Sequence, residues 1–290
     1  METAVTTNQS ATGKTLPVLV SFKNVSKTFG IGAHARTAIQ GISFEVLDLP
    51  KQGELICLVG QSGCGKSTVL RIIAGLAPHF PPTQGEVEVF GKPVMGPGSD
   101  RGLVDQKYSL LPHLTVLDNI AFGLKLQGVP KQERRSMARD WVAKVGLSGA
   151  EHKYPSELSG GMQQRVAIAA TLILKPRILL MDEPFGALDP KIRLRMQELL
   201  INLWREQEGT VFFVTHSVEE AIYLGDRVFR MAPNPGRLVE ILPVPRPDMP
   251  PEEMRRKPWF TELTQDLLRR LEEDSAESGN LAGYQGSMMK

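Results

Sequence analysis

Four short runs dominated by apolar residues recur along the chain, and segments of helical periodicity lie between them. Such runs are typical of strands buried on both faces of a sheet. Strands that alternate with helices predict an α/β domain with a parallel sheet at its core. Ligands of such sheets bind beyond the carboxyl ends of the strands. The runs are Leu55–Val59, Ile178–Met181, Val211–Val214 and Arg227–Met231.

A second kind of strand, in which polar and apolar residues alternate, occupies the N-terminal part of the chain. Val18–Phe29 alternates well enough to predict a strand pair or an edge strand. Residues 42–59 predict another strand followed by the first buried run. Glu86–Phe90 alternates more strictly, which predicts a half-buried strand turned by Gly91. We therefore expect a β-rich part beside the parallel sheet.

Between about residues 107 and 157 the pattern changes to that of helices. One apolar stripe at helical spacing comprises Met137, Ala138, Trp141, Val142 and Val145. The charged residues around it fall mostly elsewhere on the helix, so we interpret them as a solvated face. A second helix is predicted after Asp189 and Pro190, which suit an N-cap and a first helical position. Its expected core stripe is Ile192, Met196, Leu199, Leu200 and Leu203.

The two ends of the chain differ from the part between them. Residues 1–16 are rich in polar residues and predict disorder. From Ala232 onward prolines crowd the chain, which predicts an extended strap that leads to an amphipathic helix. That helix either covers the domain's own apolar surface, which we favour, or regulates or lengthens a dimer interface. Residues 275–290 again predict disorder. The apolar positions of the helix are Phe260, Leu263, Leu267, Leu268 and Leu271.

Composition narrows the class of protein. The 290 residues carry a net charge of only +2, so the chain lacks the basic character of a nucleic-acid-binding protein. No window approaches 18 uninterrupted apolar residues, and no signal peptide is visible. Any membrane role must therefore come from a partner. Cys57 and Cys64 are interpreted as reduced thiols of a cytoplasmic protein, because pairing them would distort the segment that they share.

The segment directly after the first buried run has the pattern of a phosphate-binding loop. Glycines let backbone N–H groups point around a phosphate chain, and the following helix directs its positive dipole end at the same anion. Lys66 is placed to reach the outer phosphates, and the Ser67 hydroxyl to bind Mg²⁺. Cys64 is either a favoured thiolate or, as we prefer, a small packing residue. The loop reads Gly60, Gln61, Ser62, Gly63, Cys64, Gly65, Lys66, Ser67 and Thr68.

Two acidic residues follow the second buried run. Asp182 at the strand end is placed to bind Mg²⁺, and Glu183 to polarise the water that attacks a γ-phosphate. Acids at a strand end can also simply cap a helix, so their significance depends on the phosphate loop. Leu158–Gln164 supplies a second helix start suited to an anion, in which Ser159 caps the helix and Gly160 and Gly161 leave its amides accessible.

Together, in this order, these motifs resemble the ATP-binding cassette (ABC) ATPases over about residues 18–245. The resemblance implies an α/β P-loop NTPase fold, with a RecA-like parallel sheet core, an antiparallel β subdomain and an inserted α-helical subdomain near 107–157. It implies a cassette over residues 17–245, followed by a strap, helix and tail over 246–290. It also implies a head-to-tail dimer, in which Ser159, Gly160 and Gly161 of one subunit complete the ATP site of the other.

The resemblance also implies roles for single residues. Gln106 would contact Mg²⁺ and the attacking water, and His216 would hold the γ-phosphate and Glu183. Asp189 would signal across the dimer, and adenine would stack on Phe29, for which core packing is the alternative. The expected catalytic set is Lys66, Gln106, Glu183 and His216, with Ser67, Gln106 and Asp182 as the metal set.

Two positions depart from the subgroup of nitrate, sulfonate and taurine importers, which the chain otherwise resembles at Gly98–Gly102, Tyr108–Val116 and Pro233–Arg237. Asp105 stands where phenylalanine is usual, and we expect this extra carboxylate to alter Mg²⁺ affinity or loop packing. Ala170 stands where arginine is usual, and we expect this change to weaken a salt bridge rather than catalysis. Neither change touches the expected catalytic set, so we expect an active ATPase.

The resemblance implies an ATP-hydrolysing importer subunit at the cytoplasmic face of the inner membrane. It would pair with integral permease subunits, with a second cassette (the same chain or another) and, indirectly, with an extracytoplasmic substrate-binding protein. The region Tyr108–Val116 would meet the permease, where His113 would be a titrating contact, although plain interface surface is the simpler interpretation. The alternatives are a soluble ABC ATPase without a transport role, a regulatory or non-hydrolysing cassette, and a P-loop kinase or GTPase, which would leave Leu158–Gln164 unexplained.

Overall fold

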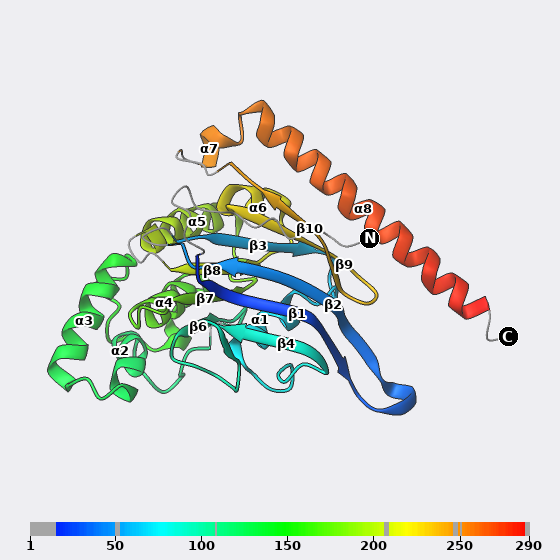
Figure 1. The fold of residues 1–290 in the computed structure, drawn as a ribbon. Helices are drawn as coiled ribbons and strands as arrows, with labels where there is room; N and C mark the ends of the chain where they lie inside the picture. Colours follow the sequence, from blue (N-terminus) through cyan, green and yellow to red (C-terminus); the bar gives the residue numbers. More distant parts are fainter. Residues whose placement is uncertain are drawn as a thin grey trace.

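A computed structural model describes residues 16–49, 53–107, 109–205, 209–245, 249 and 251–287. Its centre is a six-stranded sheet in the order β10–β9–β3–β8–β7–β6, in which only β10 runs antiparallel to its neighbour (Figure 1). All four predicted buried runs are strands of this sheet, so the predicted parallel core is confirmed. The strands are β3 (Leu55–Gly60), β6 (Arg101–Val104), β7 (Ile178–Asp182), β8 (Thr210–Val214), β9 (Arg227–Ala232) and β10 (Arg237–Pro243).

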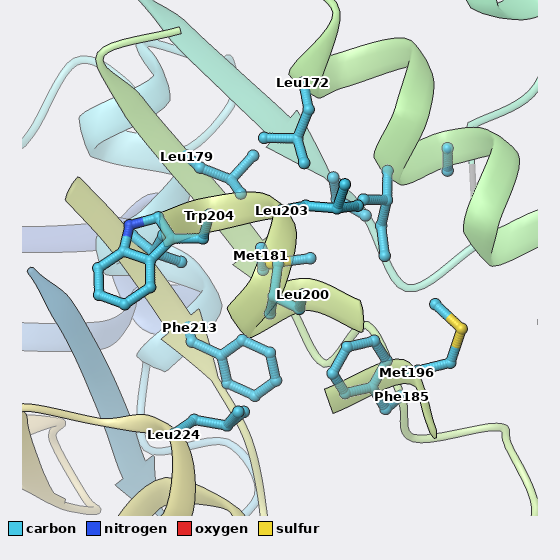
Figure 2. Packing of buried hydrophobic residues seen from close by; sticks show 14 of the residues in the cluster. Leu172, Leu179, Met181, Phe185, Met196, Leu200, Leu203, Trp204, Phe213 and Leu224 are labelled. Atoms are coloured by element: carbon cyan, nitrogen blue, oxygen red, sulfur yellow. The ribbon is translucent and has the colours of Figure 1, made fainter. Parts of the chain in front are cut away.

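The central sheet separates two hydrophobic cores. Along β8, Val211 and Phe213 face one core, whereas Phe212 and Val214 face the other. This alternation follows from the two-residue period of a strand. The first core contains the apolar faces of the helices that follow β6, β7 and β8, and Figure 2 shows Leu200 and Met196 beside Phe185 in it. The second core lies between the sheet, helix α1 (Lys66–Ala74) and the N-terminal strands.

The N-terminal strands form a separate antiparallel sheet in the order β2–β1–β4–β5. Here β1 is one continuous strand with a neighbour on each side, so the predicted edge strand or strand pair is wrong. Alternation alone could not reveal the second neighbour, because both faces of β1 are partly covered. Strand β2 begins at Arg36, before the expected residue 42. The bounds are β1 (Val18–Phe29), β2 (Arg36–Leu47), β4 (Gln84–Val89) and β5 (Lys92–Pro93), with a 3-10 turn at Gly32–His34.

The predicted helical region holds α2 (Val116–Leu126) and α3 (Lys131–Lys144), which lie at one end of the molecule (Figure 1). The predicted stripe on α3 faces the core: Ala138, Val142 and Val145 are buried, and Met137 and Trp141 pack against them. A 3-10 turn at Pro155–Glu157 leads into α4 (Gly160–Leu172), which packs against α2.

Helices α5 (Pro190–Arg205) and α6 (Val218–Leu224) follow strands β7 and β8. The Asp189 carboxylate accepts a hydrogen bond from the Ile192 backbone N–H at 3.1 Å, as an N-cap does, so the predicted cap is confirmed. Three positions of the predicted stripe, Met196, Leu200 and Leu203, are buried. The remaining two, Ile192 and Leu199, are partly buried against the same core.

The C-terminal part differs from the expected strap and tail. After Ala232 the chain turns into strand β10, and α7 (Pro251–Met254) precedes α8 (Pro258–Ser287), a single helix through most of the predicted disordered tail (Figure 1). The apolar stripe ends near Leu271, so it gave no sign that the helix continues. Once a helix has formed, each added residue gains one backbone hydrogen bond, which favours extension beyond the apolar positions. Phe260 and Leu267 are buried in the core, whereas Leu268 is 46% exposed, so the first part of α8 covers the domain's own apolar surface as predicted. The predicted disorder of residues 1–15 and 288–290 lies outside the described residues.

Candidate active site

The phosphate loop joins β3 to α1, and its backbone conformation at Gly65 is one that favours glycine. Gly65 has a φ of +92°, and a Cβ there would lie 2.3 Å from Ile39 Cγ2. Lys66 is buried, and its Nζ donates hydrogen bonds to the carbonyls of Gly60 (2.8 Å) and Gln61 (2.9 Å). The cation is therefore held against the loop backbone at the N-terminus of α1, an arrangement suited to a phosphate chain.

Two predicted metal ligands meet beside this loop. The Ser67 hydroxyl donates a hydrogen bond to Asp182 Oδ1 at 2.7 Å. Burial raises the pKa of the Asp182 carboxyl, and the Ser67 hydrogen bond acts in the opposite direction. A hydroxyl and a carboxylate from two different elements are oxygen donors of the kind that Mg²⁺ prefers, so these residues fit that ion.

Glu183 and His216 lie at the ends of neighbouring strands. The parallel register pairs Asp182 of β7 with Val214 of β8, which places the two following loops side by side. Glu183 has a φ of +49°, an uncommon value for a residue with a side chain, and its N–H bonds to the Val214 carbonyl at 3.1 Å. Its Oε1 lies 2.5 Å from His216 Nε2. The pair can act as one unit on a bound group.

Gln106 and Asp105 follow β6, the next strand of the sheet. The Gln106 side-chain amide lies 3.4 Å from Glu183 Oε2, so the structure brings these two members of the predicted catalytic set together. The Asp105 carboxylate lies 3.5 Å from the Arg71 guanidinium, and Arg71 also lies 3.5 Å from Asp182. The departure at Asp105 therefore adds a charge to the surroundings of the predicted metal ligands.

A cleft of about 370 Å³ joins most of these groups. Phe29 is half-buried and lines the wall of this cleft, so it is not a fully buried core residue. The cleft also includes two segments that the sequence did not assign to the site: Arg36–Ala38 of β2, and Asn234–Gly236, which the sequence marked only as a resemblance to the importer subgroup. The lining residues are Phe29, Arg36, Thr37, Ala38, Ser62, Gly63, Gly65, Lys66, Ser67, Thr68, Glu183, His216, Asn234, Pro235 and Gly236.

Gly236 explains how these additional segments come to the loop. A Cβ on Gly236 would lie 2.1 Å from the Cys64 carbonyl oxygen and 2.7 Å from that of Ala38. Its N–H bonds to Ala38 at 3.0 Å, and its carbonyl accepts from the Gln40 N–H at 2.8 Å. In the sequence, Gly236 stands out only as a glycine that follows two prolines, Pro233 and Pro235. The residues that Gly236 contacts are about 170 to 200 positions away in the chain, so the sequence could not predict the contact.

The Leu158–Gln164 segment lies apart from this cleft. Ser159 Oγ accepts the Met162 backbone N–H at 3.4 Å, so Ser159 is the predicted N-cap of α4. Ser159 and Gly161 line a different cleft, of about 360 Å³, together with Arg165 and Ile192. Within one chain, the described structure does not bring the phosphate loop and this segment together.

The cysteines behave as packing residues. Both thiols are free and buried. Burial raises the pKa of the Cys64 thiol, although the nearby Lys66 acts to lower it. The structure therefore favours the packing role of Cys64 over the reactive thiolate.

Comparison with known proteins places this site in a family. The ABC transporter family matches residues 39–186. An uncharacterised ABC transporter ATP-binding protein of Methanocaldococcus jannaschii is 45% identical over 263 residues, 91% of this chain and 95% of that protein. The nitrate import ATP-binding protein of a Synechocystis strain is 45% identical over 78% of this chain and 87% of its own length. The taurine import ATP-binding protein of Burkholderia thailandensis is 44% identical over 87% and 96%.

Solved structures of ATP-binding cassettes resemble this chain in fold. A dimeric ATP-binding cassette in a post-hydrolysis state, bound to ADP and phosphate, is 33% identical with a TM-score of 0.68. The match covers 78% of this chain and 99% of that one. A cassette from Clostridium perfringens at 23% identity has the same TM-score and supports the fold alone.

Proposed function

The chain belongs to the ABC transporter family, and from that premise we propose that it is the ATP-hydrolysing subunit of an importer that takes up small anions. The ATPase function follows from membership of the family. The specific roles of the residues are part of the proposal. The observation that carries it is the cleft in which Lys66, Glu183 and His216 come together at the carboxyl edge of the sheet.

The chain's own side chains supply the chemistry of hydrolysis. The loop amides and Lys66 bind and neutralise the phosphates of ATP, and Phe29 stacks on the adenine. Glu183 orients and polarises the attacking water, while His216 holds Glu183 and donates to the γ-phosphate. Because phosphoryl transfer needs positioning and charge compensation, these fixed groups stabilise the transition state without a covalent intermediate.

Ser67 and Asp182 would hold Mg²⁺, with Gln106 near the same position. When bound, the ion compensates phosphate charge as a Lewis acid. The hydrogen bond between Ser67 and Asp182 supports this assignment, because it already holds the two oxygen ligands 2.7 Å apart. Gln106 contacts Glu183, so it is placed to relate the occupancy of the site to the helices that follow it.

A head-to-tail dimer would complete the site. The separation of the Ser159–Gly161 segment from the phosphate loop supports this, because a second copy is needed to bring them together. The Asp189 loop, which caps α5, would lie at that contact. The partner is either a second copy of this chain or another cassette.

No helix of the described residues is long and apolar enough to cross a membrane. We propose that the chain docks from the cytoplasmic side on separate permease subunits, with which an extracytoplasmic binding protein works. The names of the nitrate and taurine relatives support a small oxyanion or sulfonate as the transported solute. Those names favour an importer over a soluble ABC ATPase without a transport role.

The test is reconstitution with the permease encoded beside this chain. We expect the two to co-purify, and vesicles that contain them and the binding protein to accumulate labelled taurine, an alkanesulfonate or nitrate only when ATP is present on the cassette side. Glu183→Gln should remove both ATP turnover and uptake. Co-purification without ATP-dependent uptake of any of the three would refute the solute class, and turnover without any permease partner would favour the soluble ATPase.

A further inference from the structure

A buried carboxylate lies one helical turn beyond His216 and takes no part in the chemistry described above. Glu220, on α6, is 5% exposed. Its Oε2 accepts a short hydrogen bond from the Thr215 hydroxyl, and its Oε1 accepts one from the Gln197 side-chain amide at 2.8 Å. Thr215 and Gln197 are themselves buried. Burial of a carboxylate costs free energy, and the hydrogen bonds from Thr215 and Gln197 offset part of that cost.

These bonds hold the backbone on both sides of His216. The Thr215 hydroxyl also accepts the Ser217 N–H at 3.0 Å, and the Ser217 hydroxyl accepts the Glu220 N–H at 3.2 Å. The residues before and after His216 are therefore both tied to Glu220 or to its helix. The His216 ring itself is 47% exposed and extends from this fixed segment to Glu183.

A second set of hydrogen bonds from the helix that carries Gln197 holds the loop that follows Glu183. Arg193 lies one turn before Gln197 on α5, so the two side chains share a helix face. Its guanidinium donates to the carbonyls of Phe185 (3.3 Å) and Leu188 (3.2 Å). Arg193 thus holds the 183–189 loop, and Gln197, on the same helix, holds Glu220.

We propose that Glu220 is a positioning residue, which fixes the loop that carries His216 relative to the helix and loop that follow Glu183. The Glu183–His216 contact of 2.5 Å depends on both loops, and a misplacement of about 1 Å can cost about 100-fold in rate. The effect on hydrolysis depends on the proposed function, whereas the effect on the position of His216 does not.

The first test compares Glu220→Leu with Glu220→Gln. Leucine removes both acceptors and leaves the Thr215 hydroxyl and the Gln197 amide without Glu220. Glutamine keeps an acceptor for Thr215. Its new N–H donors can bond to Gln197 Oε1, which has no partner among the described residues, if the Gln197 amide rotates. We expect kcat for ATP to fall about 10- to 100-fold in Glu220→Leu with KM within about 3-fold, and Glu220→Gln to stay within about 3-fold of wild type.

The second readout needs no nucleotide. The chain has five histidines, and the imidazole nitrogen signal of His216 can be assigned by NMR from its loss in His216→Ala. We expect this signal to shift in Glu220→Leu and to match wild type in Glu220→Gln. If the wild type fails to hydrolyse ATP, the proposed function fails, and the NMR comparison still decides the positioning role.

Should Glu220→Leu fail to fold, Thr215→Val removes only the hydroxyl at nearly constant volume, and Thr215→Ser restores it. We expect loss of kcat in the first and recovery in the second. Thr210→Val is the matched control, because it removes a buried hydroxyl at the far end of β8, the strand that Thr215 directly follows. Unchanged kcat and an unchanged His216 signal in a folded Glu220→Leu or Thr215→Val would overturn the proposal, as would equal losses in Thr215→Val and Thr210→Val.

Discussion

Asp105 offers a direct perturbation of the electrostatics around the proposed metal ligands. Its carboxylate pairs with Arg71, which also approaches Asp182. Asp105→Asn removes a negative charge near the metal ligands. It also leaves Arg71 free to pair with Asp182 alone. Both changes make the site less negative, so both act to weaken Mg²⁺ binding.

The expected size of the change in Mg²⁺ affinity depends on how far the Arg71 and Asp105 side chains are exposed to solvent. The side chains of Arg71 and Asp105 are 32% and 29% exposed, so solvent screens their interaction. Exposed ion pairs contribute about 0.2–1 kcal/mol to stability. We expect the loss of one similarly screened charge to change the free energy of Mg²⁺ binding by the same order, which corresponds to about 1.5- to 5-fold in affinity. We therefore expect the apparent Mg²⁺ affinity to fall by that factor in Asp105→Asn.

The assay is ATPase activity as a function of free Mg²⁺ at fixed ATP. Activity at saturating Mg²⁺ should equal that of wild type, because Lys66, Glu183 and His216 are unchanged. Asp100→Asn is the matched control: Asp100 lies at the opposite end of β6, where it pairs with Arg101 at 3.2 Å, and its loss should not alter Mg²⁺ dependence. Unchanged or tighter Mg²⁺ affinity in Asp105→Asn would refute this reasoning.

Three further predictions test the loop, the core and the thiol. Lys66→Ala removes a charged hydrogen-bond donor to phosphate, so ATP affinity measured by calorimetry should fall about 10- to 150-fold, and an unchanged affinity would contradict the role of Lys66. Leu200→Ala leaves a cavity between α5 and the sheet (Figure 2), so urea titration should show a loss of about 2–5 kcal/mol in the free energy of unfolding. A loss below about 1 kcal/mol would contradict the packing described. Because burial raises the pKa of Cys64, iodoacetamide should label it at pH 8 at least about 10-fold more slowly than free cysteine, and faster labelling would indicate a reactive thiolate.

The buried strands and the chemistry at their ends could be predicted from the sequence because both signals are local. Ile178–Met181 is apolar throughout and its acids follow immediately, so β7 and the position of Glu183 needed no knowledge of distant partners. The cap at Asp189 is local in the same way.

What could not be predicted depends on pairing between distant segments. The second neighbour of β1 is β4, more than 50 residues away, and the approach of Gly236 to Cys64 joins segments 172 residues apart. The same holds for Glu220, which appears in sequence as an ordinary helix residue. Its partner Gln197 lies on another helix, so the buried bond between them arises only from packing.

The most direct test of the central claim is the mass of Glu183→Gln with ATP. Its amide oxygen can still accept from His216, so ATP should bind without being consumed. We expect light scattering to show a rise from the 32.0 kDa monomer to about 64 kDa when Mg²⁺ and ATP are added, and the further change Ser159→Arg to prevent it. A protein that binds ATP at saturation and remains monomeric would contradict a site shared between two copies of this chain.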